Sequence, residues 1–200
     1  MDIQFLQADQ LDFDPRPQMG EIFAEGFAHL LASISKDTAL LAKAFAHVFD
    51  LKHFTVAVQG DKVLAMTACT NGISPIRFDK TLCRKELGFL RGSIAYTQLT
   101  KYIVNHKFPF DFHSHMGRIE IVGTATMYQG KGIAYRLIQH IMDTTAYTEY
   151  VLEVLDDNPG AIRLYEKLGF KTFQSLKTAI VQQGKRTSFL YMKCVPEDIL

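Results

Sequence analysis

The stretch RIEIVGTATMYQGKGIAYRLIQHIM, residues 118–142, runs from a strand pattern through a glycine-rich turn into a helix pattern. Alternation of apolar residues predicts a strand over 118–126. Spacing near 3.6 residues in the second half predicts a helix over about 134–142, whose apolar face carries Ile133, Leu137, Ile138, Ile141 and Met142. This unit of strand, turn and helix decides the class of fold, because it needs a sheet against which the helix can pack.

A second unit, LEVLDDNPGAIRLYEKLGF, follows at residues 152–170. The run from 150 to 155 is almost continuously apolar, as expected for a strand that is covered on both faces. Asn158-Pro159 is typical of a helix start, with Asn as the cap and Pro at the first helical position. Gly169 stands where a helix usually ends. Two successive units of this kind favour a mixed α/β sheet with at least one crossover.

Shorter patterns on either side extend the sheet and its covering helices. The sequence predicts a weak strand at 3–6, a helix at about 17–31 and a second helix capped by Asp37, with Leu41, Phe45 and Val48 on its apolar face. It also predicts two hairpins: strands 54–59 and 62–70 around Gly60-Asp61, and strands 171–181 and 186–193 around Gln183-Gly184-Lys185.

Composition limits the class of protein. The 200 residues are 48% hydrophobic and 22% charged, which suits one domain over residues 1–200 with a large core. A net charge of +1 argues against nucleic-acid binding through bulk charge. Three cysteines without CxxC spacing argue against a disulfide framework or a cysteine zinc site. Without a signal peptide or a membrane-spanning stretch, we expect a cytoplasmic protein that does not enter a membrane.

An insertion at about 72–116 differs from the rest of the chain. Between residues 76 and 110, seven basic residues face two acidic ones, for a local charge of +5, and six aromatic residues are interspersed. Ser93 predicts a helix start, with the helix running to about Val104. We expect a lid or wall over the acceptor cleft whose charges favour an acidic or aromatic acceptor. The alternative is a solvated face or a surface for a partner.

The turn Gln129-Gly130-Lys131-Gly132-Ile133-Ala134 predicts a phosphate or pyrophosphate site. Its glycines free backbone N–H groups to converge at a helix N-terminus, and Lys131 adds a positive charge. The alternative is a tight turn that needs glycine only for positive φ. A nucleoside-triphosphate loop does not fit, because Gly132 follows the lysine where Ser or Thr is required. A dinucleotide fingerprint is half present, with Tyr135 at its third glycine position and Glu153 near the place of its ribose-binding acid.

These two stretches together resemble the GNAT superfamily of acetyl-CoA-dependent N-acyltransferases. The family's motif, Gln/Arg-x-x-Gly-x-Gly/Ala, is matched by Gln129, Gly132 and Ala134. The segment 152–170 is similar to the family's strand, Asn-initiated helix and Tyr-x-x-x-Gly-Phe ending, in the right order and about 26 residues downstream. The resemblance covers 118–193 well, covers the first 70 residues in pattern only, and does not include the insertion.

The resemblance implies a largely antiparallel sheet whose central parallel pair splays apart, flanked by helices. Pantetheine is then expected between the splayed strands, on backbone groups of Val122, Gly123 and Thr124, with Asn158 at its arm. The pyrophosphate of acetyl-CoA is expected on the turn, held by Gln129, Gly130, Lys131, Gly132, Ile133 and Ala134. Thr124 replaces a usual aliphatic residue and Thr126 a common proline, and neither change removes a backbone contact.

Two side chains are the candidates for the chemistry of acyl transfer. Tyr165 matches the family tyrosine that protonates the departing thiolate, and its alternative role is that of a core aromatic residue. Glu120 is the leading candidate for the base, directly or through water, because the resemblance implies a glutamate on this strand in some family members. Strand alternation places Glu120, Val122 and Thr124 on one face, which points either toward the cleft or away from it. The alternative is a glutamate that is solvated or paired with a basic residue.

Other titratable residues offer competing interpretations. Histidine is the side chain whose ordinary pKa lies nearest working pH, so His113 and His115 are competing candidates for the base. Their HxH spacing also suggests a metal, but no acidic or cysteine partner follows at useful spacing, so we expect no metal. Glu153 and Asp156 could form a carboxylate pair, although charges that simply end a buried strand are common.

We therefore predict an N-acetyltransferase that moves an acetyl group from acetyl-CoA to a primary amine in a ternary complex. The acceptor is a small molecule or a peptide, and a homodimer is a candidate assembly because relatives often dimerise. The alternatives are a non-catalytic CoA-binding module and a dinucleotide-binding enzyme.

Overall fold

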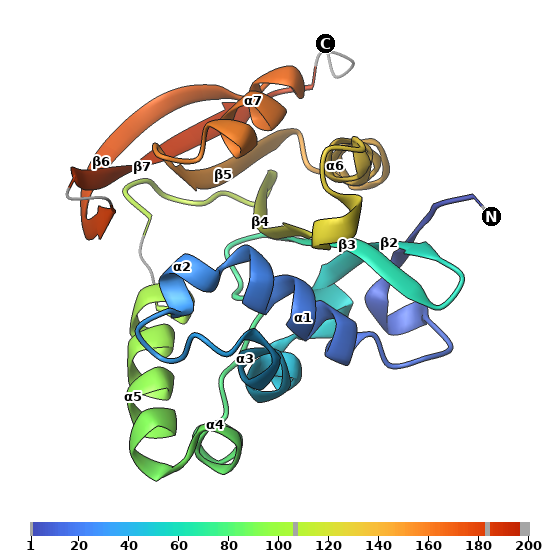
Figure 1. The fold of residues 1–200 in the computed structure, drawn as a ribbon. Helices are drawn as coiled ribbons and strands as arrows, with labels where there is room; N and C mark the ends of the chain where they lie inside the picture. Colours follow the sequence, from blue (N-terminus) through green and yellow to red (C-terminus); the bar gives the residue numbers. More distant parts are fainter. Residues whose placement is uncertain (1, 106–107, 183–184, 197–200) are drawn as a thin grey trace.

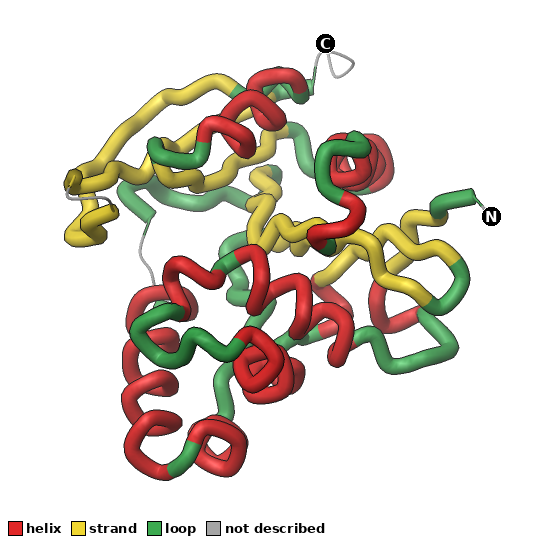
Figure 2. The backbone as a smooth tube through the Cα atoms, in the orientation of Figure 1, coloured by secondary structure: helices red, strands yellow, loops and turns green. Residues whose placement is uncertain are grey.

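The computed structural model describes residues 2–105, 108–182 and 185–196. Within these ranges seven strands form one sheet in the order β1-β2-β3-β4-β5-β7-β6, with helices on both faces (Figures 1 and 2). The strands are β1 (Gln4–Gln7), β2 (Phe54–Gln59), β3 (Lys62–Thr70), β4 (Met116–Thr124), β5 (Glu149–Leu155), β6 (Lys171–Gln182) and β7 (Lys185–Cys194).

Only the β4–β5 pair is parallel among these strands, and every other neighbouring pair is antiparallel. The mixed, largely antiparallel sheet predicted from the sequence is therefore confirmed. The β6–β7 hairpin is present as predicted, but its turn at Gln183-Gly184 lies outside the described residues.

The helices are α1 (Arg16–Gly26), α2 (Ala28–Leu31), α3 (Thr38–Phe45), α4 (Lys80–Leu87), α5 (Phe89–Leu99), α6 (Ile133–Thr144) and α7 (Pro159–Lys167). Single 3₁₀ turns occur at Ala8–Gln10 (η1), Ala46–Val48 (η2), Leu51–His53 (η3) and Thr126–Tyr128 (η5). A π-helical turn, η4 (Thr100–Val104), extends α5.

Two predicted caps are in place. The Asp37 carboxylate accepts a hydrogen bond from Leu40 N at 3.0 Å, and the Asn158 side chain accepts one from Ala161 N at 3.1 Å. These bonds satisfy backbone donors that the first helical turn leaves unpaired.

Two helix predictions were wrong in detail. The helix expected over 17–31 is broken after Gly26, where Phe27 leaves helical geometry, because glycine is a poor helix former near this end. The insertion holds two helices rather than one. Asp79 caps α4, because its carboxylate accepts a hydrogen bond from Leu82 N at 2.9 Å. Ser93 lies inside α5, where its hydroxyl donates a hydrogen bond to the Phe89 carbonyl.

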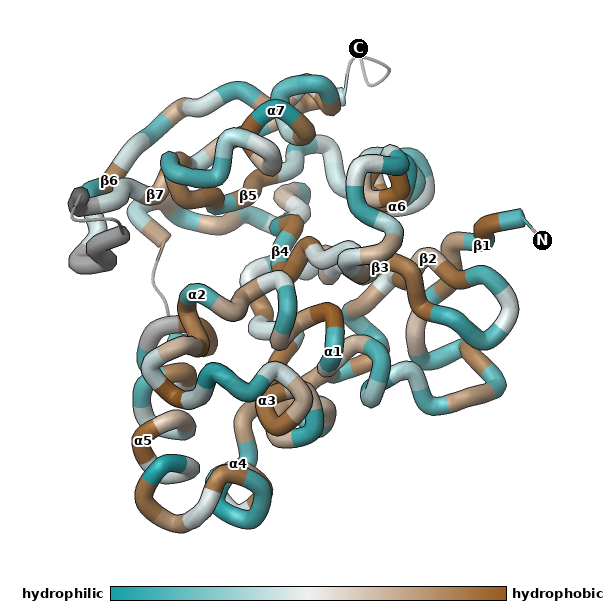
Figure 3. The backbone as a smooth tube through the Cα atoms, viewed as in Figure 1, coloured by the Kyte–Doolittle hydropathy of each residue, from teal (hydrophilic) through white to brown (hydrophobic). Residues whose placement is uncertain are grey.

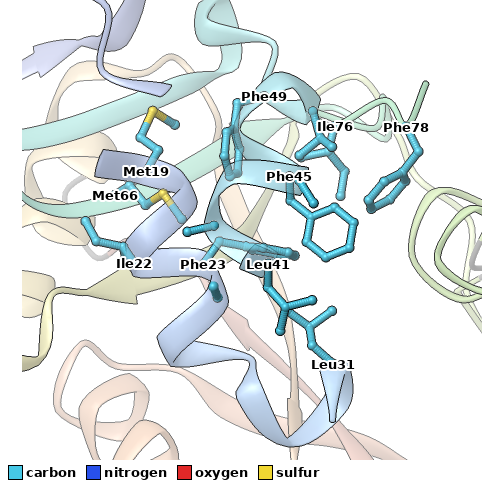
Figure 4. Packing of buried hydrophobic residues seen from close by; sticks show 14 of the residues in the cluster. Met19, Ile22, Phe23, Leu31, Leu41, Phe45, Phe49, Met66, Ile76 and Phe78 are labelled. Carbon is cyan, nitrogen blue, oxygen red and sulfur yellow. The ribbon is translucent and has the colours of Figure 1, made fainter. Parts of the chain in front are cut away.

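The core lies on both faces of the sheet. On one face, α1 and α3 bury a cluster of aliphatic and aromatic side chains that includes Met19, Phe23, Phe45 and Met66 (Figure 4). On the other face, α6 and α7 cover β4, β5 and β7 with side chains such as Ile138, Ile141 and Phe170. The α4–α5 hairpin extends the first layer away from the sheet, next to α3 (Figure 1).

Candidate active site

The strands β4 and β5 separate in the middle of the sheet. Their pairing runs from Met116↔Glu149 to Ile119↔Leu152, and no pairing beyond that point occurs in the described chain. Residues 120–124 of β4 therefore keep their pairing with β3 but turn an open edge toward β5. An open strand edge offers backbone N–H and C=O groups that an extended ligand can pair with.

A β-bulge at Ile121 accompanies this separation. Ile121 has φ +53°, the only positive φ among the described non-glycine residues, which is a strained conformation for a β-branched side chain. The β3–β4 register shifts at the same place, between Met66↔Gly123 and Ala68↔Glu120. One extra residue of β4 is therefore accommodated here, as in other β-bulges.

The bulge corrects the expectation that Glu120, Val122 and Thr124 share one face. Ile121 packs against the cluster beneath α1, whereas Val122 packs against the cluster beneath α6 and α7. Strict alternation fails because the extra residue reverses the order of faces. Gly123 also points to α1, where an added Cβ would come within 2.6 Å of Ile22 Cγ2. No residue type in this part of β4 indicates the bulge, so local pattern could not predict it.

The glycine-rich turn forms the start of α6. Gly130 and Gly132 both have φ +73°, and Gly132 is the N-cap residue in left-handed geometry. No heavy atom lies within 4 Å of a Cβ built on either glycine, so backbone conformation alone requires them. The Gln129 side chain donates to the Thr124 carbonyl at 3.1 Å and fixes the turn to the end of β4.

Replacing Gly132 by Ala tests this requirement. We expect a loss of about 1–2 kcal/mol in the free energy of unfolding, because an L-residue pays that cost in left-handed geometry. Weaker acetyl-CoA binding should accompany it if the amides at the start of α6 hold the ligand. Chemical denaturation and calorimetric titration measure the two effects. Gly26→Ala is the control, since Gly26 also has open space around it but no positive φ, and it should be neutral or stabilising.

A cleft of about 1650 Å³ opens where β4 and β5 separate. It brings together the predicted site residues Glu120, Val122, Gly123, Thr124, Gln129, Gly130, Gly132, Ile133, Ala134, Asn158 and Tyr165. The predicted Lys131 is not among its lining residues, and its ammonium lies 5.0 Å from the centre of the Tyr128 ring. The backbone of the turn, rather than the lysine charge, therefore faces the cleft.

Glu120 is held in a buried ion pair. Arg118 Nε donates to Glu120 Oε1 at 2.7 Å, and the Thr70 hydroxyl donates to the same oxygen at 3.1 Å. The side chain of Arg118 is 10% exposed and that of Glu120 is 20% exposed. Burial raises the pKa of Glu120 to about 6, although Arg118 and Thr70 oppose that rise. A carboxylate with this pKa is ionised at neutral pH and is close to the range in which a base works best.

Arg118 is a part of the site that the sequence analysis did not single out. A guanidinium nitrogen also donates to the Ile73 carbonyl at 3.2 Å, and its Cζ lies 5.0 Å from the centre of the Phe108 ring. Arg118 and Glu120 are two residues apart on one strand, so the alternation of β4 before the bulge predicts that they are neighbours. That spacing was the available signal.

Tyr165 lies on α7, buried under the opening of the cleft. Its side chain belongs to the cluster around Phe170, and the two ring centres are 6.1 Å apart. Burial raises the pKa of its hydroxyl well above the ordinary value, so it stays protonated throughout the physiological range. The ring is therefore a part of the core that also lines the cleft, and its role as a proton donor stays a prediction.

Glu153 and Tyr191 add a second polar pair. The two residues are opposite each other in the β5–β7 ladder, and both line the cleft. Burial raises the pKa of Tyr191 most, and the carboxylate of Glu153 raises it further. Asp156, its suggested partner in a carboxylate pair, instead accepts from Ser188 N at 3.0 Å and is not among the cleft residues.

The histidine alternatives lie away from the cleft. His113 is exposed, with Nε2 3.7 Å from the Glu149 carboxylate, and His115 is exposed as well. Neither belongs to the lining of the cleft. In the part of the chain that the structure describes, no three His, Cys, Asp or Glu residues are grouped closely enough to hold a metal ion.

The insertion contributes a wall to the cleft, but not with its charges. Its lining residues are Gln98, Leu99, Ile103 and Phe108. Among the described basic residues of 76–105, none lines the cleft, and Arg84 and Lys80 lie against the rings of Phe89 and Tyr96. In Figure 3 hydrophilic and hydrophobic positions are interspersed along this hairpin. Lys107 lies outside the described residues. We expected a preference for an acidic acceptor because basic residues of the insertion would face the cleft. None of the described ones does, so this expectation has no support.

Comparison with known proteins agrees with this geometry. The family model described as "Acetyltransferase (GNAT) family" matches residues 35–170, more than half of the chain. The chain belongs to the GNAT family. This family uses acetyl-CoA, and the open edge of β4, the turn amides and the cleft provide places for an extended ligand that ends in phosphates.

Individual GNAT relatives are distant. N-alpha-acetyltransferase RimI of Mycobacterium tuberculosis is 35% identical over 63 residues, which is 32% of this chain and 37% of that protein. Matches to curated relatives thus span well under two thirds of their length. The solved N-acetyltransferase of Staphylococcus aureus Mu50 has a TM-score of 0.62 at 16% identity, covering 96% of this chain and all of the other.

Another solved neighbour is yncA of Salmonella typhimurium, described as an acetyltransferase with its cofactor acetyl-CoA. Its TM-score is 0.56 at 16% identity. The superposition covers 97% of this chain and 92% of the yncA chain. At these identities the TM-scores show a shared fold. Among the described residues, no helix combines the length and apolar character needed to cross a bilayer.

Proposed function

We propose that this GNAT protein transfers the acetyl group of acetyl-CoA to a primary amine by direct transfer in a ternary complex. The observation that carries the proposal is Glu120: a buried carboxylate with a pKa near 6 lies in the same cleft as a protonated tyrosine, where the two parallel strands separate. Acyl transfer to an amine needs one group that accepts a proton and one that donates a proton.

In this proposal the chain first holds its cosubstrate. Backbone groups of Val122, Gly123 and Thr124 pair with the pantetheine arm along the open edge of β4. The amides from Gly130 to Ala134 hold the pyrophosphate at the positive end of α6. Asn158 keeps its carbonyl oxygen on Ala161 N, which leaves its NH₂ group for the pantetheine amides. Acetyl-CoA supplies the activated acetyl group as a thioester.

The proton transfers follow from the two side chains. The amine nitrogen forms a bond to the acetyl carbon while the carbon–sulfur bond breaks. Glu120 accepts the proton that the nitrogen loses, directly or through one water molecule, and Arg118 keeps the carboxylate ionised and oriented. Tyr165 donates its hydroxyl proton to the departing sulfur. The products are an amide and the free thiol of CoA. The proton on Glu120 then returns to Tyr165 through solvent, so both side chains are restored and atoms and charge balance over the cycle.

The direct test is release of the CoA thiol from acetyl-CoA in the presence of a panel of amines, including amino-terminal peptides. RimI is an N-alpha-acetyltransferase, which is the reason to include peptides. Turnover with any amine, with acetylated product identified by mass, supports the proposal. Tight binding of acetyl-CoA without turnover of any acceptor would favour the non-catalytic module instead.

The pH profile tests the role of Glu120. A primary alkyl amine has a pKa of about 10 and must lose its proton to react. When kcat/KM is calculated from the total amine concentration, its logarithm therefore rises with pH with a slope of one. Below pH 6 Glu120 also becomes protonated and inactive as a base, so the slope should steepen to two. The break is expected at about pH 6, the pKa of Glu120.

Arg118→Met should move this break to higher pH, because removing the guanidinium takes away the largest influence that lowers the pKa of Glu120. Arg118→Lys should return it toward the original position, since an ammonium restores the charge. An unchanged break in Arg118→Met, with the protein still folded by circular dichroism, would contradict the assignment of the break to Glu120.

A further inference from the structure

The wall of the cleft on the Glu120 side is apolar. Phe27, Leu30 and Ile34 come from the α2 region, and Leu99 and Ile103 come from the end of α5 and the π turn η4. Ile34 and Leu99 are buried in the cluster beneath α1, and Phe27 and Ile103 pack against it. Residues of both segments line the same cleft and belong to or pack against the same cluster, so they form one surface.

This apolar surface adjoins the proposed base. Ile121, the residue after Glu120, packs against the same cluster, whereas Val122 faces the helices α6 and α7 on the opposite side of the sheet. The cosubstrate is proposed to bind at α6 and along the open edge of β4. An amine that presents its nitrogen to Glu120 can then extend the rest of its structure along this apolar wall. The charged lining residues Glu153, Arg163 and Lys177 belong to β5, α7 and β6, on the other side of the cleft.

Charged groups on this wall offer no partner to a charged substrate tail. Arg118 is committed to Glu120 and to the Ile73 carbonyl, and it stacks on Phe108. The other polar lining residues of the α2 and α5 segments are His29, Ser33 and Gln98, all exposed at the rim. A second ammonium or a carboxylate placed among Leu99, Ile103 and Ile34 would lose water without gaining an ionic partner.

We propose that the acceptor is a primary amine carried on an extended apolar group, an alkyl chain or an aromatic ring, and that Ile103 of the insertion is a residue that determines this specificity. The inference rests on the proposed function and specifies the substrate class of the same site. It replaces the acidic acceptor expected from the charge of the insertion. Selectivity arises because apolar contact favours one class while an unpaired buried charge disfavours the others.

Three amines with six carbon atoms each provide the test: hexylamine, 1,6-diaminohexane and 6-aminohexanoate. They differ only in whether the far end is apolar, cationic or anionic. We expect kcat/KM for hexylamine to exceed that of both charged analogues by at least about tenfold. Within an alkylamine series, each further buried methylene should raise kcat/KM by roughly fourfold, until the wall is covered. Equal or better turnover of either charged analogue overturns the inference.

The outcomes separate this inference from the proposed function. If 1,6-diaminohexane or 6-aminohexanoate is the best substrate, acetyl transfer stands and the apolar substrate class is wrong. If no amine of any class releases CoA although acetyl-CoA binds, both are wrong. Peptides with apolar or charged residues after the amino terminus show whether the apolar group belongs to a small amine or to a polypeptide.

A charge placed in the wall should reverse the preference. Ile103→Glu offers a carboxylate to a distal ammonium, so the ratio of kcat/KM for 1,6-diaminohexane over hexylamine should rise by at least about tenfold. Loss of stability lowers both rates and cannot produce this reversal. Ile94→Glu is the matched control, because Ile94 is 52% exposed on α5 and does not line the cleft; its ratio should not change. An unchanged ratio in Ile103→Glu would contradict the role of Ile103.

Discussion

Glu120→Gln is expected to lower kcat/KM by about 10²–10⁴-fold, the range found when a general base is removed. Glutamine keeps the shape of the side chain and can still accept from Arg118 and Thr70, but it cannot take a proton from the amine. The slope change near pH 6 should vanish with it, because the variant has no group that titrates there. Steady-state kinetics between pH 5 and 9 measures both effects.

The controls for this variant separate chemistry from folding. Binding of acetyl-CoA by calorimetry should be unchanged, since the cosubstrate is proposed to pair with backbone groups. Glu166→Gln removes an exposed carboxylate outside the cleft and should leave kcat/KM and the pH profile as they are. If Glu120→Gln retains wild-type activity, another group or bulk water accepts the proton, and the proposed base is wrong.

Tyr165→Phe is expected to lower kcat by about 10²-fold, toward the lower end of the range for a general acid. Burial raises the pKa of the tyrosine well above that of a thiol, so complete proton transfer to the sulfur is uphill, and a hydrogen bond to the developing thiolate supplies much of the benefit. Stopped assays of CoA release at saturating acetyl-CoA give kcat directly.

Phenylalanine preserves the packing of this ring against Phe170, so the melting temperature should change little. Tyr147→Phe is the matched control, because it removes a tyrosine hydroxyl outside the cleft and should not alter kcat. A fall in melting temperature without a fall in kcat would mean that Tyr165 is a core residue alone.

The sequence predicted those elements whose structure depends on local chemistry. Asn158-Pro159 specifies a helix start through an acceptor side chain and a fixed φ, and the structure has that cap. Gly130 and Gly132 specify positive φ, and both adopt it. The continuous apolar run of β5 follows from its burial on both faces. The family was predicted from two motifs in the right order, the turn with Gln129, Gly132 and Ala134 and the segment 152–170.

Features that depend on contacts between distant segments were not predictable. The bulge at Ile121 depends on how β3 and β4 align, and Ile121 has no residue type that indicates positive φ. The pairing of Glu120 with Thr70 joins residues 50 positions apart. The insertion was expected to face the cleft with its charges, yet it does so with Leu99 and Ile103, because the three-dimensional path of α5 decides which side of the helix turns inward.

By itself, then, the sequence determined a mixed α/β sheet with at least one crossover and a glycine turn at the start of a helix. Those follow from periodicity, capping and glycine conformation, which act over a few residues. The central parallel pair and the candidates Glu120 and Tyr165 came from the resemblance of two sequence motifs to the GNAT family. Only the tertiary structure decided that β4 and β5 separate after Ile119, that burial brings the pKa of Glu120 to about 6 beside Arg118, and that the acceptor wall is apolar. Burial, desolvation and the sides that helices present to a cleft are properties of the packed chain.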